Sequence, residues 1–120
     1  MLVSMSSDCI FCKIVAGGIP AKKLFEDERV IAIADIDPKA PVHALVIPKQ
    51  HIASLAEVGA SEAEKTLVGH LLGIANELAR ERGLSKGYRI VVNTGPDGGQ
   101  TVDHLHVHLL GGRAMHWPPG

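Results

Sequence analysis

The sequence predicts a single α+β domain in which an antiparallel sheet packs against one long helix. Three features predict it: about five short segments rich in β-branched residues, one long segment with helical periodicity, and a strand connection too short for a parallel crossover. With 120 residues the chain can bury one hydrophobic core but not two. Apolar residues make up 46% and charged residues 21%, which is typical of a globular chain rather than a disordered one.

The composition also excludes several classes of function. A net charge of −1 disfavours a protein that binds DNA or RNA mainly through charge, and 3% aromatic residues are too few for a base-stacking platform. No apolar run approaches the ~18 residues that cross a bilayer, and the N-terminus lacks the features of a signal peptide. We therefore expect no nucleic-acid partner, no membrane partner, and a cytoplasmic protein with reduced cysteines.

The N-terminal part predicts a short helix. Residues 1–7 are expected to form a disordered leader, and residues 8–120 the single domain. Within that domain, the apolar stretch Ile10–Ala16 predicts one or two helical turns. Two glycines end the stretch, and Pro20 prevents its resumption.

Three strands are predicted next. Leu24–Glu26 is a short candidate, followed by a charged turn. Val30–Ile36 and Val42–Ile47 are rich in β-branched residues and too short for typical helices, and Pro48 ends the second of them. The loop between these two strands is short, so we expect them to be antiparallel neighbours.

Residues Ser61–Arg82 predict the long helix. Ser61 and Glu64 match a capping box, in which each side chain satisfies a free backbone donor. Gly83 supplies the C-terminal stop. At 1.5 Å per residue the helix is about 30 Å long and can cover one face of a sheet. An apolar stripe at helical spacing marks its buried face: Leu67, Leu71, Ile74, Ala75 and Leu78.

The C-terminal part predicts two more strands, Tyr88–Asn93 and His104–Leu110. The glycine-rich residues 95–100 form a tight loop between them. The tail, residues 111–120, contains glycines, prolines and the only tryptophan, and we expect it to be extended.

Three alternating histidines are the most informative feature of the sequence. Because side chains on a strand alternate between faces, His104, His106 and His108 are expected on one face. The opposite face then carries the residues that pack into the core, Leu105, Val107 and Leu109. A row of histidines does not resemble a hydrophobic core. It indicates a metal site, an anion site or acid–base chemistry.

The residues around this row favour an anion. Gly98 and Gly99 permit positive φ angles and a close approach of a ligand to backbone N–H donors. Thr101 adds a hydroxyl group, and Asn93 adds an amide at the end of the preceding strand. A loop of this composition that leads directly into a histidine row predicts a phosphate-binding site.

Several further segments carry a resemblance: Ile19-Pro20-Ala21-Lys22, Phe25-Glu26-Asp27, Asp35-Ile36, Leu45-Val46-Ile47-Pro48-Lys49 with His51, Gly98-Gly99-Gln100, Gly111-Gly112-Arg113 and Met115-His116-Trp117-Pro118-Pro119-Gly120. Together with the His-x-His-x-His motif, they make the chain from Cys9 to Gly120 similar to the histidine triad (HIT) family, and within it to the Hint branch of nucleotide-binding proteins. The resemblance implies the HIT-like α+β fold and a homodimer whose two sheets join across a two-fold axis.

The resemblance also implies an activity, the hydrolysis of purine nucleoside phosphoramidates to AMP or GMP and an amine. His106 would attack the phosphorus and form a nucleotidyl-histidine intermediate, which water would then hydrolyse. His108 would contact the phosphate or the leaving group, and His43 would stand beside the triad that begins with His104. Thr101 occupies a position where relatives usually carry Ser. The implied nucleotide contacts are Asp35, Ile36, Asn93, Gly99, Gln100, Thr101, His106 and His108.

The two cysteines leave three readings open. Cys9-x-x-Cys12 is compatible with a redox motif, with inert buried thiols, or with half of a tetrahedral zinc site. Some HIT proteins bind zinc through this pair, and their other ligands match His51 and His104. The resemblance therefore implies a structural Zn²⁺ ion and no catalytic cofactor.

Other functions remain as alternatives. A dinucleoside polyphosphate hydrolase or a nucleotidyltransferase of the same superfamily would use similar chemistry at His106. A nucleotide-binding scaffolding module would bind without needing turnover. The row His104, His106 and His108 is also compatible with a catalytic zinc site of three histidines.

Overall fold

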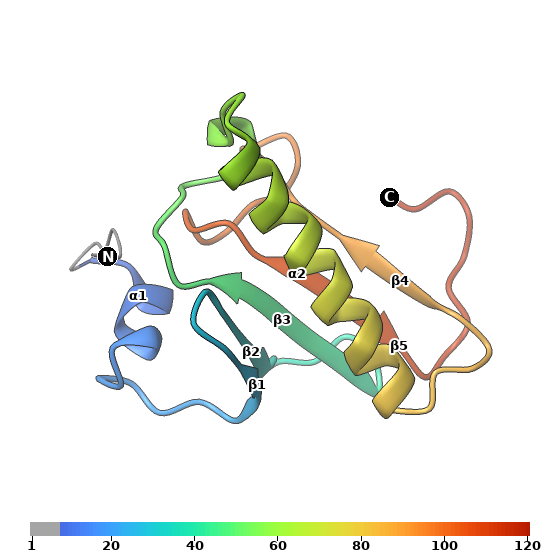
Figure 1. The fold of residues 1–120 in the computed structure, drawn as a ribbon. Coiled ribbons are helices and arrows are strands. Elements are labelled where there is room, and N and C mark those ends of the chain that lie inside the picture. The colour runs from blue at the N-terminus through green and yellow to red at the C-terminus, as the bar shows by residue number, and fades with distance from the viewer. Residues whose placement is uncertain (1–7) are drawn as a thin grey trace.

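Five strands form one antiparallel sheet in the order β1-β2-β3-β5-β4, within the residues 8–120 that the computed structural model describes (Figure 1). The predicted leader, residues 1–7, lies outside the described residues. The predicted α+β fold is confirmed. The strands are β1 (Lys23–Glu26), β2 (Val30–Ala34), β3 (Val42–Pro48), β4 (Tyr88–Val91) and β5 (Val107–Gly111).

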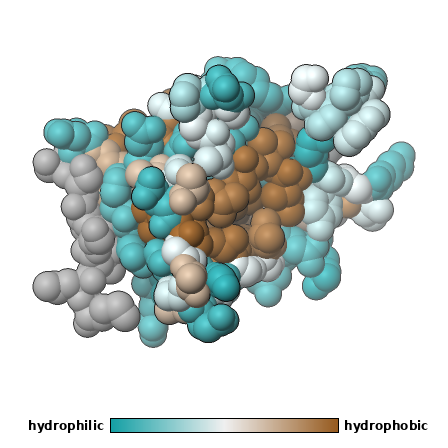
Figure 2. Space-filling view, turned by 90° about the horizontal axis from the view of Figure 1, so that it is seen from above, coloured by the Kyte–Doolittle hydropathy of each residue, from teal (hydrophilic) through white to brown (hydrophobic). Residues whose placement is uncertain are grey.

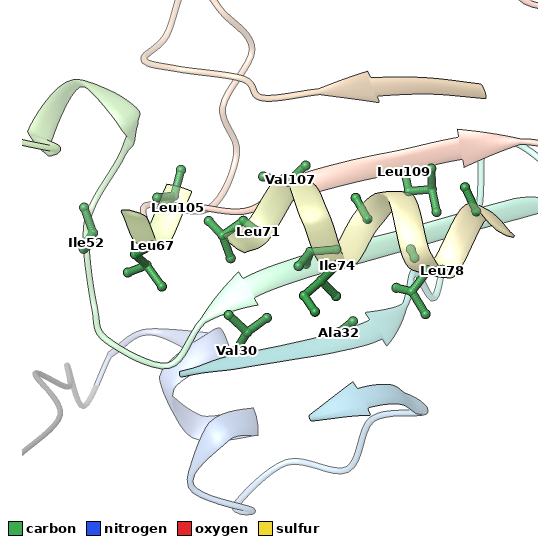
Figure 3. Packing of buried hydrophobic residues seen from close by; sticks show 14 residues of the cluster. Val30, Ala32, Ile52, Leu67, Leu71, Ile74, Leu78, Leu105, Val107 and Leu109 are labelled. Atoms are coloured by element: carbon green, nitrogen blue, oxygen red, sulfur yellow. The ribbon is translucent and has the colours of Figure 1, made fainter. Parts of the chain in front are cut away.

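The long helix α2 (Glu62–Glu81) lies along one face of the sheet (Figure 1). Its apolar stripe, including Leu71 and Ile74, points at alternate residues of the strands, among them Val30, Val107 and Leu109 (Figure 3). These side chains form the main hydrophobic core, and burying each stabilises the fold by about 1.5–3 kcal/mol.

The helix α2 begins and ends close to the residues that the sequence predicts. The Ser61 hydroxyl accepts the backbone N–H of Glu64 at 3.2 Å. The Glu64 carboxylate returns to the backbone N–H of Gly59 at 3.1 Å, two residues before the cap rather than at the cap itself. At the other end Arg82 is the C-cap, and Gly83 adopts a φ of +71° that favours glycine.

The short helix α1 (Ile10–Val15) packs on the opposite face of the sheet. Phe11 and Ile14 contact the residues of β2 and β3 that point away from α2, such as Ile31 and Leu45. Because β2 and β3 are covered on both faces, nearly every residue in them is buried. This explains why these two strands read as continuous apolar runs rather than as alternating ones.

The last strand is shorter than predicted. The sequence predicts a strand from His104, but β5 begins at Val107 because the preceding backbone bonds elsewhere. The N–H of His104 donates to the carbonyl of Val102, and the N–H of Leu105 donates to that of Ile52. The side chains nevertheless keep alternating between the two faces ahead of β5, since Leu105 lies in the core under α2.

Smaller differences occur at three other places. The strands β2 and β4 end at Ala34 and Val91, each two residues before the predicted end. A single 3₁₀ turn, η1 (Leu55–Glu57), was not expected; Ser54 caps it by accepting the N–H of Ala56. None of the described helices is long and apolar enough to span a membrane.

Candidate active site and metal cluster

The central histidine of the motif presents one free ring nitrogen. His106 Nδ1 lies 2.7 Å from the backbone carbonyl of His104. A carbonyl only accepts, so Nδ1 carries the proton and Nε2 keeps its lone pair. The ring is 5% exposed, and no fully buried side-chain nitrogen or oxygen in residues 8–120 lacks a hydrogen-bond partner. Since Nε2 has no partner among these residues, it must reach the surface. A neutral imidazole with an accessible lone pair is a competent nucleophile.

The third histidine is oriented by a pair of rings and a backbone amide. The N–H of Lys39 donates to His43 Nδ1 at 3.0 Å, which leaves the proton of the neutral ring on Nε2. His43 Nε2 in turn lies 2.9 Å from His108 Nδ1 and donates to it. His108 therefore carries its own proton on Nε2 and presents it as a donor. The ring centroids of His108 and His106 are 5.0 Å apart, so this donor lies beside the ring that carries the free lone pair.

This arrangement requires neutral rings, and their surroundings keep them neutral. Burial lowers the pKa of His43 below its usual value, although Asp35 opposes the shift. Burial, followed by the neighbouring His106 and His43, lowers the pKa of His108 to about 4. Both rings are therefore uncharged near pH 7.

The loop after β2 brings the predicted nucleotide contacts close to this pair. An Asp35 carboxylate oxygen lies 3.4 Å from His43 Nε2, and its other oxygen accepts the N–H of Asp37. The next residue, Ile36, is 99% exposed. A carboxylate and a free aliphatic side chain thus stand together at the edge of the histidine cluster.

The glycine-rich loop has a backbone conformation that favours glycine at two positions. Gly99 has a φ of +78°, and a Cβ at Gly98 would lie 2.3 Å from the Thr94 carbonyl oxygen. Thr101 is exposed, and neither its N–H nor its hydroxyl has a partner among the described residues. Continuing the β4–β5 register past Val91 opposite His108 puts Asn93 beside His106. Thr101 thus keeps unpaired donors, whereas the N–H groups of Gly99 and Gln100 already donate to the carbonyls of Pro96 and Gly95.

Unlike the other predicted nucleotide contacts, the Gln100 side chain forms its hydrogen bonds to the backbone of the protein itself. Its amide nitrogen donates to the carbonyls of Ala53 and Val102, at 2.8 and 2.9 Å. Its amide oxygen accepts the N–H of Gly95 at 3.0 Å. Both donors are used inside the protein, so this side chain shapes the loop.

The four predicted metal ligands converge on one point. Cys9, Cys12, His51 and His104 bring their donor atoms within 4.8 Å of one another. His104 Nδ1 lies 3.2 Å from Cys9 Sγ, 3.6 Å from Cys12 Sγ and 3.2 Å from His51 Nδ1. A tetrahedral Zn²⁺ ion with two sulfur and two nitrogen ligands needs donor separations of about 3.3–3.8 Å. The donor set and its spacing fit that ion.

The tautomer of His104 also fits a metal. Its Nε2 lies 2.8 Å from the carbonyl of Pro48, so Nε2 carries the proton and Nδ1 offers a lone pair to the cluster. Burial lowers the pKa of His104 to about 4, which keeps the ring neutral near pH 7. The same residue thus holds His106 through its carbonyl and faces the metal cluster through its ring.

A second cluster of ligand atoms is less suited to a metal. Asp35, His43 and His108 also bring donor atoms within 4.8 Å. However, the Lys39 N–H places the proton of His43 on Nε2, the atom that faces the cluster. The three motif histidines do not form such a group among the described residues, which argues against a zinc site made of His104, His106 and His108.

One expectation about the histidine row was wrong. His104 is fully buried and His106 nearly so, although the row does not resemble core. The reason is Phe11 of α1, whose ring packs edge-on against both rings at 5.8 and 5.1 Å. A buried imidazole is tolerated because the backbone carbonyls of His104 and Pro48 satisfy its N–H groups.

Sequence reasoning did not identify Phe11 or the backbone of Lys39 as parts of the site. Phe11 carried a usable signal, since it lies between the two cysteines of the predicted metal site. Outside the site, His70 pairs with Asp27 at 2.6 Å, and His116 is exposed in the tail.

The chain matches known proteins over nearly its full length. It matches the HIT domain family over residues 16–115. An uncharacterized HIT-like protein from Synechococcus elongatus is 55% identical over 97% of this chain and all of its own length. A 14 kDa zinc-binding protein from Zea mays is 48% identical over 95% of this chain and 89% of its own.

Solved structures agree with these matches. A HIT family hydrolase from Legionella pneumophila has a TM-score of 0.90 at 49% identity, covering 94% of this chain and all of that one. A Zn-bound histidine triad family protein from Mycobacterium smegmatis has a TM-score of 0.77 at 36% identity, covering 88% and 76%. A histidine triad nucleotide-binding protein from Candida albicans has 0.78 at 33%, covering 92% and 83%. With the triad and the fold in place, this chain belongs to the HIT, or histidine triad, family.

Proposed function

We propose that the protein hydrolyses purine nucleoside phosphoramidates, releasing a nucleoside monophosphate and an amine. One observation carries the proposal: the lone pair of His106 Nε2 lies beside the N–H donor of His108, the His104 carbonyl orients the first ring, and the His43 side chain orients the second. Similarity to a HIT family hydrolase and to a histidine triad nucleotide-binding protein supports the reaction class and the ligand class.

In the first step, His106 Nε2 attacks the α-phosphorus, forming a P–N bond to the ring. The bond from phosphorus to the leaving amine breaks, and its electron pair stays on the amine nitrogen. His108 Nε2–H lies on the adjacent ring and protonates that nitrogen. His43 can then pass its Nε2 proton to His108 Nδ1. The two rings thus share the negative charge that His108 acquires when it gives up its own proton. The carbonyl of His104 stabilises the N–H of the charged His106 ring.

In the second step, water attacks the phosphorus of the nucleotidyl-histidine. The bond between His106 Nε2 and phosphorus breaks, and the ring recovers its lone pair. The water proton goes to His108 Nε2, and the proton on His108 Nδ1 returns to His43 Nε2, so both rings regain their starting tautomers. Splitting the hydrolysis into two displacements avoids a direct attack by water on the phosphoramidate.

The binding residues suit a nucleotide. The Asp35 carboxylate would accept hydrogen bonds from the ribose hydroxyls, and the exposed Ile36 would contact the base. Asn93 and Thr101 would donate to the phosphate, and Gly99 would give the loop its turn, because its N–H already donates to the carbonyl of Pro96. Gln100 would contribute by holding the loop in shape, because both its amide N–H groups are already used.

The metal cluster would hold a structural Zn²⁺ ion. Cys9, Cys12, His51 and His104 supply four protein ligands, which complete a tetrahedron and leave no position open for substrate. When bound, the ion would cross-link α1 to the segment that carries the triad. The zinc-binding relative and the Zn-bound neighbour support this assignment. Reduced thiols are consistent with the proposed cytoplasmic location.

We also propose that the protein is a homodimer. β4 lies at the edge of the sheet and pairs only with β5, so its outer backbone groups are open. Figure 2 shows a face on which hydrophobic residues gather at the centre and hydrophilic residues surround them. Such a patch is typical of an interaction surface, and an edge-to-edge pairing would continue the sheet.

The test is AMP release from adenosine 5′-phosphoramidate, with and without a chelator. Wild type is expected to turn over, and His106→Asn is expected to lose at least about a thousandfold in kcat while still binding AMP. His70→Asn is the matched control, because it removes a histidine outside the site. Absence of turnover by folded wild type that binds AMP would overturn the proposal in favour of a binding module.

A further inference from the structure

The C-terminal tail rests on the loop between β2 and β3. Gly112 has a φ of +90°, and a Cβ there would lie 2.9 Å from Cβ of Pro41. The adjoining Gly111 is buried, and a Cβ on it would meet the side chain of Leu84 at 2.5 Å. Gly112 is thus packed closely against this loop, and Gly111 against the segment that follows α2.

Arg113 adds a directed contact to the same loop. Its Nε donates to the carbonyl of Lys39 at 3.1 Å, and its Nη1 donates to the neighbouring carbonyl of Ala114. The N–H of Lys39 is the group that donates to His43 Nδ1. The carbonyl held by Arg113 and the N–H that orients His43 therefore flank one Cα atom, and only two backbone dihedrals separate them.

We infer that Arg113 is a positioning residue for the histidine pair. By holding the Lys39 carbonyl, it keeps the Lys39 N–H directed at His43 Nδ1. That contact places the His43 proton on Nε2 and so makes His108 a donor at Nε2. Without it, His43 can exchange the proton between its two nitrogens, and His108 is no longer confined to one tautomer.

The catalytic consequence of this inference rests on the proposed function, but the tautomers do not. They are a property of the folded protein and can be measured without substrate. The chain also offers a matched control: Arg89 donates through Nη2 to the carbonyl of His116 at 2.8 Å. It ties down a later part of the tail and has no hydrogen bond to the 35–43 loop among the described contacts.

The experiment compares Arg113→Gln, Arg89→Gln and wild type as full chains, using imidazole ¹⁵N chemical shifts of His43 and His108 at pH 7. We expect one tautomer for each ring in wild type and Arg89→Gln. In Arg113→Gln the His43 shifts should move toward the average of two tautomers. In turnover, Arg113→Gln should lower kcat by about three- to tenfold and change KM by less than about twofold.

Unchanged shifts in folded Arg113→Gln would overturn the inference, and so would a kcat equal to that of Arg89→Gln. If Arg113→Gln does not fold, the shifts are measured in Arg113→Lys, which keeps the charge but loses the Nε donor. The same movement is expected there, and unchanged shifts would again contradict the inference. An inactive wild type would overturn the proposed function but not this inference, because the tautomers can still be measured without turnover.

Discussion

Three histidines of the site take their orientation from backbone groups, and His108 takes its own from the His43 ring. The carbonyls of Pro48 and His104 hold His104 and His106, and the N–H of Lys39 holds His43. Backbone groups do not titrate, so these tautomers do not depend on the ionisation of a carboxylate. Each of these three rings, while neutral, should therefore keep its tautomer whatever the charge of nearby carboxylates.

This leads to a prediction about the titration of His108. His108 must accept from His43 at Nδ1, and protonation of that nitrogen would set two N–H groups against each other. Burial lowers its pKa to about 4, so the ring should stay neutral well below the ordinary histidine value and take up a second proton only toward pH 4. The pH dependence of its imidazole ¹⁵N chemical shifts checks this. A titration midpoint near pH 6.5, the usual pKa of histidine, would contradict it.

The same shift affects stability. A histidine with a pKa lowered by folding binds its proton more readily in the unfolded chain. For His108 this destabilises the fold as pH falls from about 6.5 toward 4, and the stability is fully present above that window.

Part of this detail could be predicted from the sequence. Alternation put the three histidines opposite Leu105, Val107 and Leu109, and the structure confirms that these three lie in the α2 core. The tautomers could not be predicted, because the Pro48 carbonyl and the Lys39 N–H reach the rings only through tertiary folding. The burial of His104 was missed for the same reason, since it depends on where α1 docks.

At the scale of elements, the best predicted feature is α2. Its cap, its stripe and its terminal glycine are local signals, and the structure follows them within one residue. The last strand was predicted less well, since periodicity continues through His104 while the hydrogen-bond ladder does not. A period-two pattern reports which face a side chain takes, and pairing with a neighbouring strand decides where the strand begins.

The cap makes a stability prediction. Ser61→Ala removes the acceptor for the Glu64 N–H and should lower the free energy of unfolding by about 1 kcal/mol. Ser85→Ala, in the exposed loop after α2, is the control and should change it by less than about 0.5 kcal/mol. Urea unfolding measures both. Equal effects of the two substitutions would show that the cap does not stabilise α2.

For the whole molecule, the metal cluster joins segments that lie far apart in the sequence. Cys9 and Cys12 belong to the start of α1, while His51 follows β3 and His104 precedes β5. A bound ion would therefore cross-link the N-terminal helix to the segment that carries the nucleophile. Structural zinc typically contributes to folding directly, because the unfolded chain has no preformed site.

Metal removal should consequently destabilise the protein. We expect one Zn²⁺ per chain in the purified protein, and a melting temperature lower by at least about 5 °C after chelation or in Cys12→Ser. Adding zinc back should restore the chelated wild type but not Cys12→Ser. A melting temperature that does not respond to chelator in a protein shown to contain zinc would contradict the structural role.

The proposed homodimer also concerns the whole molecule, and hydrophobic periodicity carries no information about it. Sedimentation equilibrium should give twice the mass of the chain. A monomer at micromolar concentration would contradict the pairing proposed at the β4 edge.

In the proposed mechanism, His106 becomes covalently attached to the nucleotide during turnover. Turnover of adenosine 5′-phosphoramidate is quenched within milliseconds, and intact-mass measurement with peptide mapping locates any added group. We predict one adenylyl group on His106, absent from His106→Asn and lost when the reaction runs to completion. Full turnover without an adduct, or an adduct on another residue, would contradict the mechanism proposed for this site.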